Sequence, residues 1–204
     1  MTTNELLIAT GNKGKVAELR LLLAGLSLRL RDLAEFSGAV EVEETGQTFA
    51  DNAALKAQGY AGQTGLWTLA DDSGLEVEAL GGAPGVYSAR YGGAGLTDAG
   101  RVELLLEKLS GTAAGERRAR FVCVIAIADP GGRIRNLSTG TCEGRIVHAP
   151  RGTRGFGYDP VFLPDGFEQT FGELPAEIKH DISHRARALK AARSFLVNHF
   201  QSIR

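Results

Sequence analysis

The stretch Leu66-Trp67-Thr68-Leu69-Ala70-Asp71-Asp72-Ser73-Gly74 joins an apolar run to two adjacent acids, a hydroxyl and a glycine. The apolar run predicts a buried strand. The polar residues after it favour a turn, because Asp and Ser bond nearby backbone and Gly tolerates positive φ. A carboxylate at a strand end is also suited to bind a hard divalent cation or to accept a proton from water. Because successive side chains of a strand alternate, Asp71 is expected to face away from Asp72. Of the two, Asp72 is the preferred candidate for the proton acceptor.

Outward from this stretch, strands and helices alternate in the first half of the chain, and strands predominate later. Strands are predicted at 6–10 and 28–33, with a helix from about residue 15 between them. Another helix begins at Thr48 to Asp51, which has the capping-box spacing. Further strands are predicted at 75–80, 121–128, 136–141 and 144–147, and further helices at 97–109 and 183–200. This order predicts an α/β fold with a mixed sheet, in which the later strands form a second lobe.

Length and composition indicate one globular domain, 1–204, with room for two lobes. Lys and Arg total 23 and Asp and Glu total 24, so no basic excess attracts a nucleic acid polymer. The N-terminal residues predict no signal peptide, and no apolar run comes near the roughly 20 residues that span a bilayer. Cys123 and Cys142 lack metal-ligand spacing, and Cys123 lies in an apolar strand. We therefore expect a cytoplasmic protein with no membrane partner.

Glycine is abundant, at 27 of 204 residues, and it clusters beside polar motifs. One such motif is Thr10-Gly11-Asn12-Lys13-Gly14-Lys15, between a predicted strand and a predicted helix. Backbone N–H groups at a helix start favour anions, and a lysine there adds positive charge. The spacing matches neither the Walker P-loop nor the dinucleotide fingerprint. The motif is therefore either a phosphate-binding turn or an ordinary strand-to-helix turn.

A group of cations, Lys179, His184 and Arg185, surrounds the start of the last predicted helix, with Ser183 as its N-cap. Positive charge in a first helical turn opposes the helix dipole at a cost of about 0.3–1 kcal/mol per residue. An electronegative ligand atom would offset this charge, although a solvated helix start is the alternative.

Aromatic rings lie beside a glycine and an acid in Phe156-Gly157-Tyr158-Asp159. Stacking of a base on an aromatic ring contributes about 1–3 kcal/mol and is tolerant of base identity. The neighbouring acid would then add discrimination between bases, but aromatic residues beside Gly and Pro are also common in turns.

Taken together, these motifs closely resemble the inosine/xanthosine triphosphate pyrophosphatases, the dITP/XTP diphosphatases. The resemblance runs from about Leu7 to about Phe195 and rests on blocks that stand in order along the chain. The blocks are Thr10 to Lys15, Ala70 to Gly74, Leu80 to Tyr91, Gly155 to Pro160 and Ile182 to Arg185.

The resemblance implies an elongated mixed β-sheet flanked by helices, with two lobes, a nucleotide cleft between them and a homodimeric assembly. It implies that Asp72 is the catalytic base and a Mg²⁺ ligand, with Glu44 as the second acid and Glu43 or Asp71 as alternatives to it. The substrate-binding residues that it implies are Thr10, Gly11, Asn12, Lys13, Gly14, Lys15, Lys56, Ser73, Phe156, Gly157, Tyr158, Asp159, Lys179, His184 and Arg185.

The activity implied is hydrolysis of the deaminated purine nucleotides ITP, dITP and XTP to the monophosphate and pyrophosphate. Two alternatives remain at this point. A Maf-like nucleotide pyrophosphatase would keep the reaction and change the base preference. A nucleotide-binding sensor without turnover would need the phosphate loop but not two acids and a metal.

Overall fold

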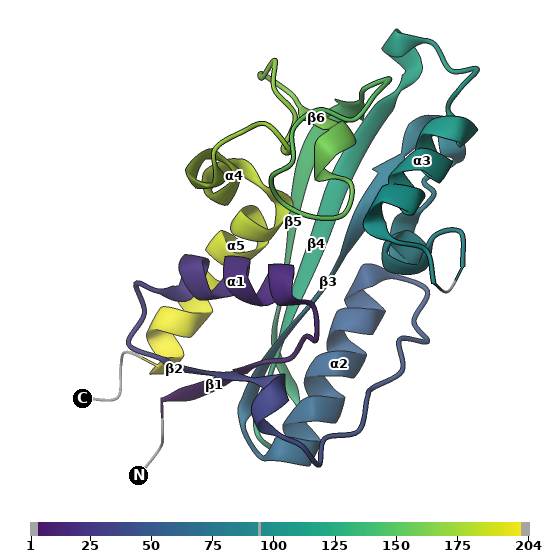
Figure 1. The fold of residues 1–204 in the computed structure, drawn as a ribbon. Coiled ribbons are helices and arrows are strands. Elements are labelled where there is room, and N and C mark those ends of the chain that lie inside the picture. Colours follow the sequence, from purple (N-terminus) through teal and green to yellow (C-terminus); the bar gives the residue numbers. More distant parts are fainter. Residues whose placement is uncertain (1–3, 94, 201–204) are drawn as a thin grey trace. The chain divides into compact units, whose positions relative to one another are not determined.

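The computed structural model describes residues 4–93 and 95–200, and the chain divides into two compact units (Figure 1). Unit 1 comprises Met1–Asp72, Cys123–Gly140 and Arg185–Arg204, and unit 2 comprises Ser73–Val122 and Thr141–His184. The strands are β1 (Glu5–Ile8), β2 (Arg29–Asp32), β3 (Trp67–Val77), β4 (Arg118–Ala128), β5 (Ile134–Ile146) and β6 (Phe162–Pro164). They form a sheet in the order β2-β1-β3-β4-β5-β6, and the unit boundaries fall within β3, β4 and β5.

The sheet is mixed, as the order of elements predicted. Strand β1 pairs in parallel with β2 and β3, whereas β5 and β6 are antiparallel. The register aligns Ile8 with Leu69, and the backbone N–H of Ala9 donates to the carbonyl of Leu69 at 2.8 Å. The segment that follows β1 therefore runs alongside the part of β3 that carries the two acids.

The turn predicted at Asp71 to Gly74 is wrong, because β3 continues through these residues from Trp67 to Val77. Both acids are buried and ion-paired, so they do not need solvent or a turn to satisfy their charges. Strand β5 is likewise continuous where two strands were predicted. Its Gly144 lets β6 approach closely, since a Cβ there would lie 2.4 Å from the carbonyl oxygen of Leu163.

The helices of unit 1 cover both faces of its part of the sheet. They are α1 (Lys13–Leu23), α2 (Phe49–Thr64) and α5 (His184–Phe200), the last from Arg185 onward. In Figure 1, α1 and α5 lie on one side of the strands and α2 on the other. The α1 and α5 side holds an apolar core that includes Leu6, Ile8 and Leu69, with the free thiol of Cys123. The predicted capping box of α2 is confirmed, with Thr48 as N-cap.

Unit 2 has its own core around α3 (Asp98–Lys108) and the outer parts of β3, β4 and β5. Leu105 of α3 packs in this core with Phe121 and Phe162. Strand β6 and the short helix α4 (Ala176–Ile182) were not predicted, because three and seven residues are too few to show a periodic pattern.

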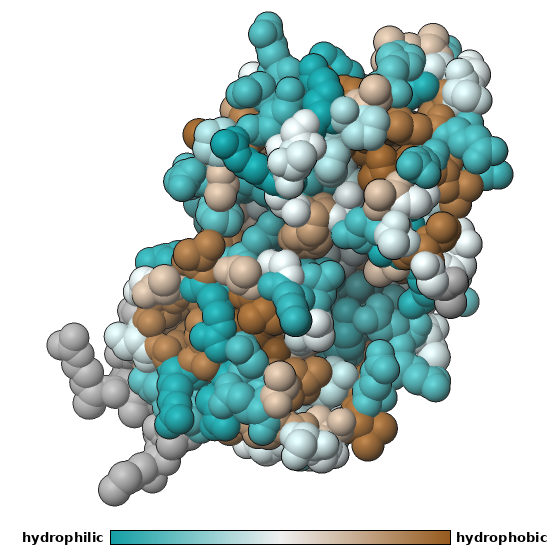
Figure 2. Space-filling view, viewed as in Figure 1, coloured by the Kyte–Doolittle hydropathy of each residue, from teal (hydrophilic) through white to brown (hydrophobic). Residues whose placement is uncertain are grey.

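The surface carries few large apolar side chains. Figure 2 shows hydrophilic residues over much of one face, with hydrophobic residues in smaller groups between them. Val40 and Leu21 are the most exposed large hydrophobic residues, at 72% and 61%. Among the described residues, no helix combines the length and the apolar character needed to cross a membrane.

Candidate active site

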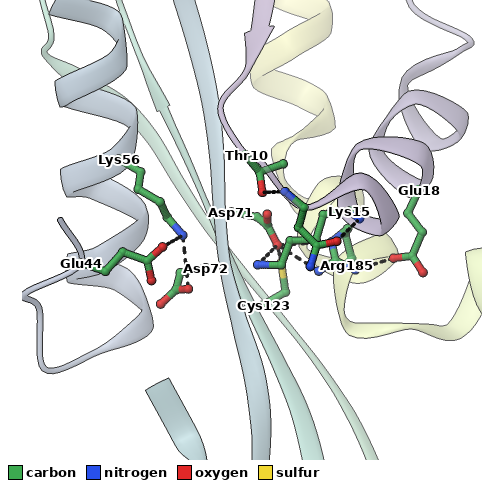
Figure 3. Close-up of polar contacts among 10 residues, drawn as sticks. Thr10, Lys15, Glu18, Glu44, Lys56, Asp71, Asp72, Cys123 and Arg185 are labelled. Carbon is green, nitrogen blue, oxygen red and sulfur yellow. Dashed lines mark hydrogen bonds and ion pairs between the residues drawn. The ribbon is translucent and has the colours of Figure 1, made fainter. Parts of the chain in front are cut away.

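Asp71 and Asp72 point to opposite sides of β3 and take part in separate ion-pair clusters (Figure 3). This confirms the predicted alternation. Asp71 faces the side covered by α1 and α5, and Asp72 faces α2. Both clusters lie within unit 1, and each combines side chains from segments far apart in the sequence.

The first cluster joins Asp72, Lys56 and Glu44. The ammonium of Lys56, on α2, donates to Oε1 of Glu44 at 2.8 Å and to Oδ1 of Asp72 at 3.3 Å. Two carboxylates share one lysine, so the cluster has a net negative charge when all three groups are ionised. Such a cluster attracts a cation.

Burial sets the acid–base character of this cluster. It raises the pKa of Asp72 above the usual range, against the opposing effects of Lys56 and Lys15. Burial also acts to lower the pKa of Lys56, but the carboxylates of Asp72, Asp71 and Glu44 outweigh it and raise that pKa. Lys56 is therefore a firmly charged ammonium, whereas Asp72 binds a proton more readily than an exposed aspartate does.

The donor set of this cluster fits magnesium. Oδ2 of Asp72 is buried and forms no hydrogen bond with any described residue, so it is available to a ligand. Within residues 4–93 and 95–200, no three His, Cys, Asp or Glu side chains are grouped closely enough to bind a metal by themselves. Magnesium usually takes only one or two protein carboxylates and completes its shell with water and phosphate oxygens, which Asp72 and Glu44 would permit.

The second cluster is centred on Asp71, which is fully buried. Its Oδ2 lies 3.2 Å from the ammonium of Lys15 and 3.0 Å from Nη2 of Arg185. Arg185 also donates through Nη1 to the buried Glu18. Burial would raise the pKa of Asp71, but Lys15 and Arg185 outweigh it and hold that pKa well below the usual range. Two acids and two bases balance, so this cluster is neutral.

The loop Thr10 to Lys15 forms the turn from β1 into α1. Asn12 is the N-cap of α1, and its side chain accepts a hydrogen bond from the backbone N–H of Lys15 at 3.1 Å. The hydroxyl of Thr10 accepts from the N–H of Asn12 at 3.2 Å. The first turn of α1 has no acidic residue, and Gly11, Asn12 and Lys13 are exposed. An exposed helix start without acids is suited to an anion.

Unit 2 contains the other predicted site residues. Lys179 is buried, and its ammonium lies 2.6 Å from Oδ2 of Asp159 and 4.8 Å from the ring centroid of Phe156. The same carboxylate accepts from the backbone N–H of Phe156 at 2.8 Å. Asp159 thus fixes both the aromatic loop and the lysine.

Further contacts hold this part of unit 2 in place. The hydroxyl of Tyr158 donates to the carbonyl of Ser88 at 3.0 Å, and the ring of His184 stacks on that of Phe121, with centroids 4.7 Å apart. Ser73 is half-buried on β3.

The prediction that a ligand offsets the cations at the start of α5 is wrong, because protein carboxylates offset Lys179 and Arg185. Helix α5 does begin at His184, as predicted. However, Asp159 balances Lys179, and Asp71 and Glu18 balance Arg185. Arg185 is also only 1% exposed. The base-reading roles of these cations therefore rest on the resemblance alone.

Sequence reasoning missed three residues that hold the site. Glu18 pairs with Arg185, and Asp98 accepts from the backbone N–H of Gly157 at 2.9 Å. Asn52, on α2, lies beside Asp72 and is fully buried. One signal was available: Asn52, Lys56 and Tyr60 are spaced by four and form a polar stripe on a helix whose other buried residues are Phe49 and alanines.

The chain matches known proteins over nearly its whole length. The family model of the Ham1 family matches residues 6–195. A dITP/XTP pyrophosphatase of Desulforamulus reducens is 52% identical over 192 residues, which cover 94% of this chain and 95% of the relative. A dITP/XTP pyrophosphatase of a Nostoc species is 48% identical, covering 93% and 92% of the two chains.

Solved structures agree with these matches. A HAM1 protein from Coxiella burnetii superimposes with a TM-score of 0.86 at 42% identity, covering 95% of this chain and 98% of that one. The Ham1 protein of Staphylococcus aureus gives a TM-score of 0.84 at 39% identity, covering 96% and 99%. The resemblance noted from the sequence and its mixed α/β fold are thereby confirmed.

Proposed function

The chain belongs to the Ham1 family, and we propose that it hydrolyses ITP, dITP and XTP to the monophosphate and pyrophosphate. Relatives named dITP/XTP pyrophosphatases, which match over nearly the full length of the chain, support this activity and favour it over a Maf-like base preference. The observation that carries the chemistry is the cluster of Asp72, Lys56 and Glu44 with its available carboxylate oxygen. A sensor without turnover would not need this cluster.

Asp72 is proposed as the base. It accepts a proton from a water molecule as the water oxygen bonds to the α-phosphorus. The bond from the α-phosphorus to the bridging oxygen breaks, and pyrophosphate leaves with the electron pair. The pKa of Asp72, raised by burial, makes this carboxylate a stronger base than an exposed aspartate.

Asp72 and Glu44 are also proposed to hold Mg²⁺, which would stabilise the negative charge that develops on the phosphate oxygens. Lys56, whose ammonium bonds both acids, is proposed as a further phosphate contact. It keeps its charge throughout, because its pKa is raised.

The triphosphate is assigned to the loop that starts α1. Backbone N–H groups there and the ammonium groups of Lys13 and Lys15 supply positive charge to phosphate oxygens. Asn12 shapes the turn as N-cap, and Gly11 and Gly14 keep side chains away from the backbone. Thr10 supports Asn12 through its hydroxyl.

Base recognition is assigned to unit 2 and the start of α5. Phe156 would supply the stacking surface, with Gly157 and the buried Tyr158 shaping the loop beside it, and a 6-keto purine would accept hydrogen bonds from donors at Lys179, His184 and Arg185. The substrate-contact role of Ser73 and the anchoring role of Asp159 belong to the same assignment. Adenine presents a donor where these purines present an acceptor, so the protein donors would stay unpaired. Such a mismatch rejects an analogue by up to about 10⁴–10⁵.

An assay of the products tests the proposal. Purified protein with Mg²⁺ is given ITP, dITP, XTP and ATP, and pyrophosphate and orthophosphate are measured separately. We expect pyrophosphate as the first product and a clear preference for the deaminated purines. Orthophosphate as first product would contradict the reaction, and equal turnover of ATP would contradict the specificity. Because the substrates are nucleotides of the cellular pool, we expect the activity in the cytoplasm.

A further inference from the structure

The segment that carries Glu44 lies along α2 and is held to it at regular intervals. Every second residue from 40 to 46 contacts a side chain of the helix, and each contact lies about one turn nearer the start of α2. The pairs are Val40 with Gln63, Val42 with Tyr60, Glu44 with Lys56, and Gly46 with Asn52. The segment therefore runs antiparallel to the helix, and α2 fixes the position of Glu44.

Two glycines allow this close approach. A Cβ at Gly46 would lie 2.5 Å from Cβ of Asp51 and 2.7 Å from Oδ1 of Asn52. A Cβ at Gly59 would lie 2.6 Å from a methyl carbon of Val42. A side chain at either position would push the segment away from α2.

Asn52 differs from the other three helix residues because its carboxamide acts both on the segment that carries Glu44 and on Asp72. Its Oδ1 accepts from the backbone N–H of Gly46 at 2.8 Å, two residues after Glu44. Its Nδ2 is buried without a well-formed hydrogen bond, but it approaches the carboxyl group of Asp72 closely enough to act on it as a donor, which acts to lower the pKa of Asp72 against the larger effect of burial. Oδ2 of Asp72 is also buried without a hydrogen bond.

A buried donor beside a buried acceptor, neither of them satisfied, is costly for a folded protein. A buried polar group without a full hydrogen bond calls for an explanation, and a catalytic role or a bound ion is a common one. If binding of a cation reoriented the Asp72 carboxylate, Nδ2 of Asn52 would be placed to donate a full hydrogen bond to it.

We propose that Asn52 is a positioning residue for both acids: Oδ1 holds the segment that carries Glu44, and Nδ2 orients the carboxylate of Asp72. This inference rests on the proposed function, because it takes these two acids as the metal ligands. Asn52 itself contacts neither metal nor substrate in this role. Groups that orient metal ligands in this way typically contribute about 10- to 100-fold to metal affinity or activity.

Two substitutions at Asn52 distinguish the role of its Oδ1 from the role of its Nδ2. Asn52→Asp keeps an oxygen for the N–H of Gly46 and replaces the donor beside Asp72 with an acceptor. Asn52→Leu keeps the branched shape and the number of side-chain heavy atoms and removes both functions. Gln63→Leu is the matched control, because Gln63 holds Val40 to the same helix through the same carboxamide group.

Two measurements are needed, of which only one depends on turnover. The first is the affinity for Mn²⁺, followed by its EPR signal, in the presence of the α,β-methylene analogue of ITP, which is not cleaved. The second is kcat and KM for ITP with Mg²⁺. Thermal melting of each variant confirms that it is folded.

We expect Asn52→Leu to weaken Mn²⁺ binding and to lower kcat, each by about 10- to 100-fold. Asn52→Asp should bind Mn²⁺ at least as tightly as the wild type, because the Glu44 segment stays in place, yet lose about 10- to 100-fold in kcat at nearly unchanged KM. Gln63→Leu should match the wild type in both measurements.

Wild-type Mn²⁺ affinity and kcat in a folded Asn52→Leu would overturn the proposal. A wild-type kcat in Asn52→Asp would overturn the role of Nδ2 at Asp72. A wild-type protein that neither binds Mn²⁺ nor cleaves ITP would instead contradict the proposed function, so the two failures are distinguishable.

Discussion

Asp71 and Asp72 are adjacent in the sequence, but their carboxylates form ion pairs with different basic side chains on opposite faces of β3. Asp71 joins Lys15 of α1 to Arg185 of α5 and is neutralised by them, whereas Asp72 shares Lys56 with a second acid. The strand thus separates a balanced cluster, suited to holding helices together, from one with excess negative charge, suited to a cation.

Asp72→Asn is expected to remove turnover and to leave the fold intact. The amide neither accepts the proton of the attacking water nor supplies an anionic ligand, so kcat should fall by about 10²–10⁴-fold or more. Stability should be unchanged or slightly higher, because burial already disfavours the ionised carboxylate. Product assays and a thermal melt check both statements. Turnover within a few-fold of the wild type would remove Asp72 as the base.

Asp71→Asn is expected to act on stability, in a pH-dependent way. It leaves buried Arg185 with one fewer anion, which costs about 3–5 kcal/mol in the free energy of unfolding near neutral pH. The folded pKa of Asp71 lies below the usual 3.8, so only the unfolded chain takes up this proton as the pH falls below that value. On acidification the wild type therefore loses the stability that ionised Asp71 contributes. The difference in the free energy of unfolding between the wild type and Asp71→Asn should narrow below about pH 4.

Urea unfolding of both proteins at pH 7 and pH 3, in metal-free buffer, measures this difference. An advantage that stays constant between the two pH values would mean that Asp71 is not the titrating group. In the enzyme assay at neutral pH, the folded fraction of Asp71→Asn should retain more activity than Asp72→Asn.

The fold could be predicted from the sequence wherever apolar spacing determines local structure. The strand predicted at 6–10 is β1, which ends two residues earlier at Ile8, and the capping box predicted at Thr48 is the start of α2. Prediction failed at Asp71 to Gly74, where local preference favours a turn. There, the charges that allow a strand come from Lys15, Lys56 and Arg185, which are distant in the sequence.

The candidate site could be predicted only as a set of motifs. The family blocks indicated Asp72, Lys56 and Glu44, and the structure brings these three together. The four-residue spacing places Asn52 on the face of α2 that carries Lys56, but it does not reveal the bond from Gly46 to Asn52, because that contact depends on how the segment before α2 folds back along the helix. Likewise, the pairing of Arg185 with Glu18 could not be predicted, because α5 and α1 are far apart in the sequence and meet only in the folded chain.

Lys15→Met is expected to weaken hydrolysis of all nucleoside triphosphates by similar factors. Its ammonium is assigned to the phosphate tail, which ITP, XTP and ATP share, so kcat/KM should fall for each while their ratios stay constant. Lys190→Met removes the same charge from an exposed position of α5 and should behave as the wild type. A selective loss for ITP would instead assign Lys15 to the base.

A homodimer is expected from the family resemblance. Light scattering at micromolar concentration should give a mass of twice the 21.6 kDa of one chain. The mass should not depend on nucleotide or Mg²⁺, because neither is proposed to lie at a subunit interface. A monomer mass across the concentration range would contradict the expectation.

Arg185 is expected to contribute to base selection, and its burial decides which variant tests this. Arg185→Ala would leave Asp71 and Glu18 buried without their cation, so loss of fold would obscure loss of selectivity. Arg185→Lys keeps the charge but loses the planar, multi-donor guanidinium. If that group supports reading of the 6-keto oxygen, kcat/KM for ITP should fall by about 10- to 100-fold, the value of one charge-assisted hydrogen bond, and the preference for ITP over ATP should narrow. Arg193→Lys, the same change at an exposed site on α5, is the control. An unchanged ITP-to-ATP ratio in folded Arg185→Lys would move base reading to the Phe156–Asp159 loop and leave Arg185 as the residue that ties α5 to Asp71 and Glu18.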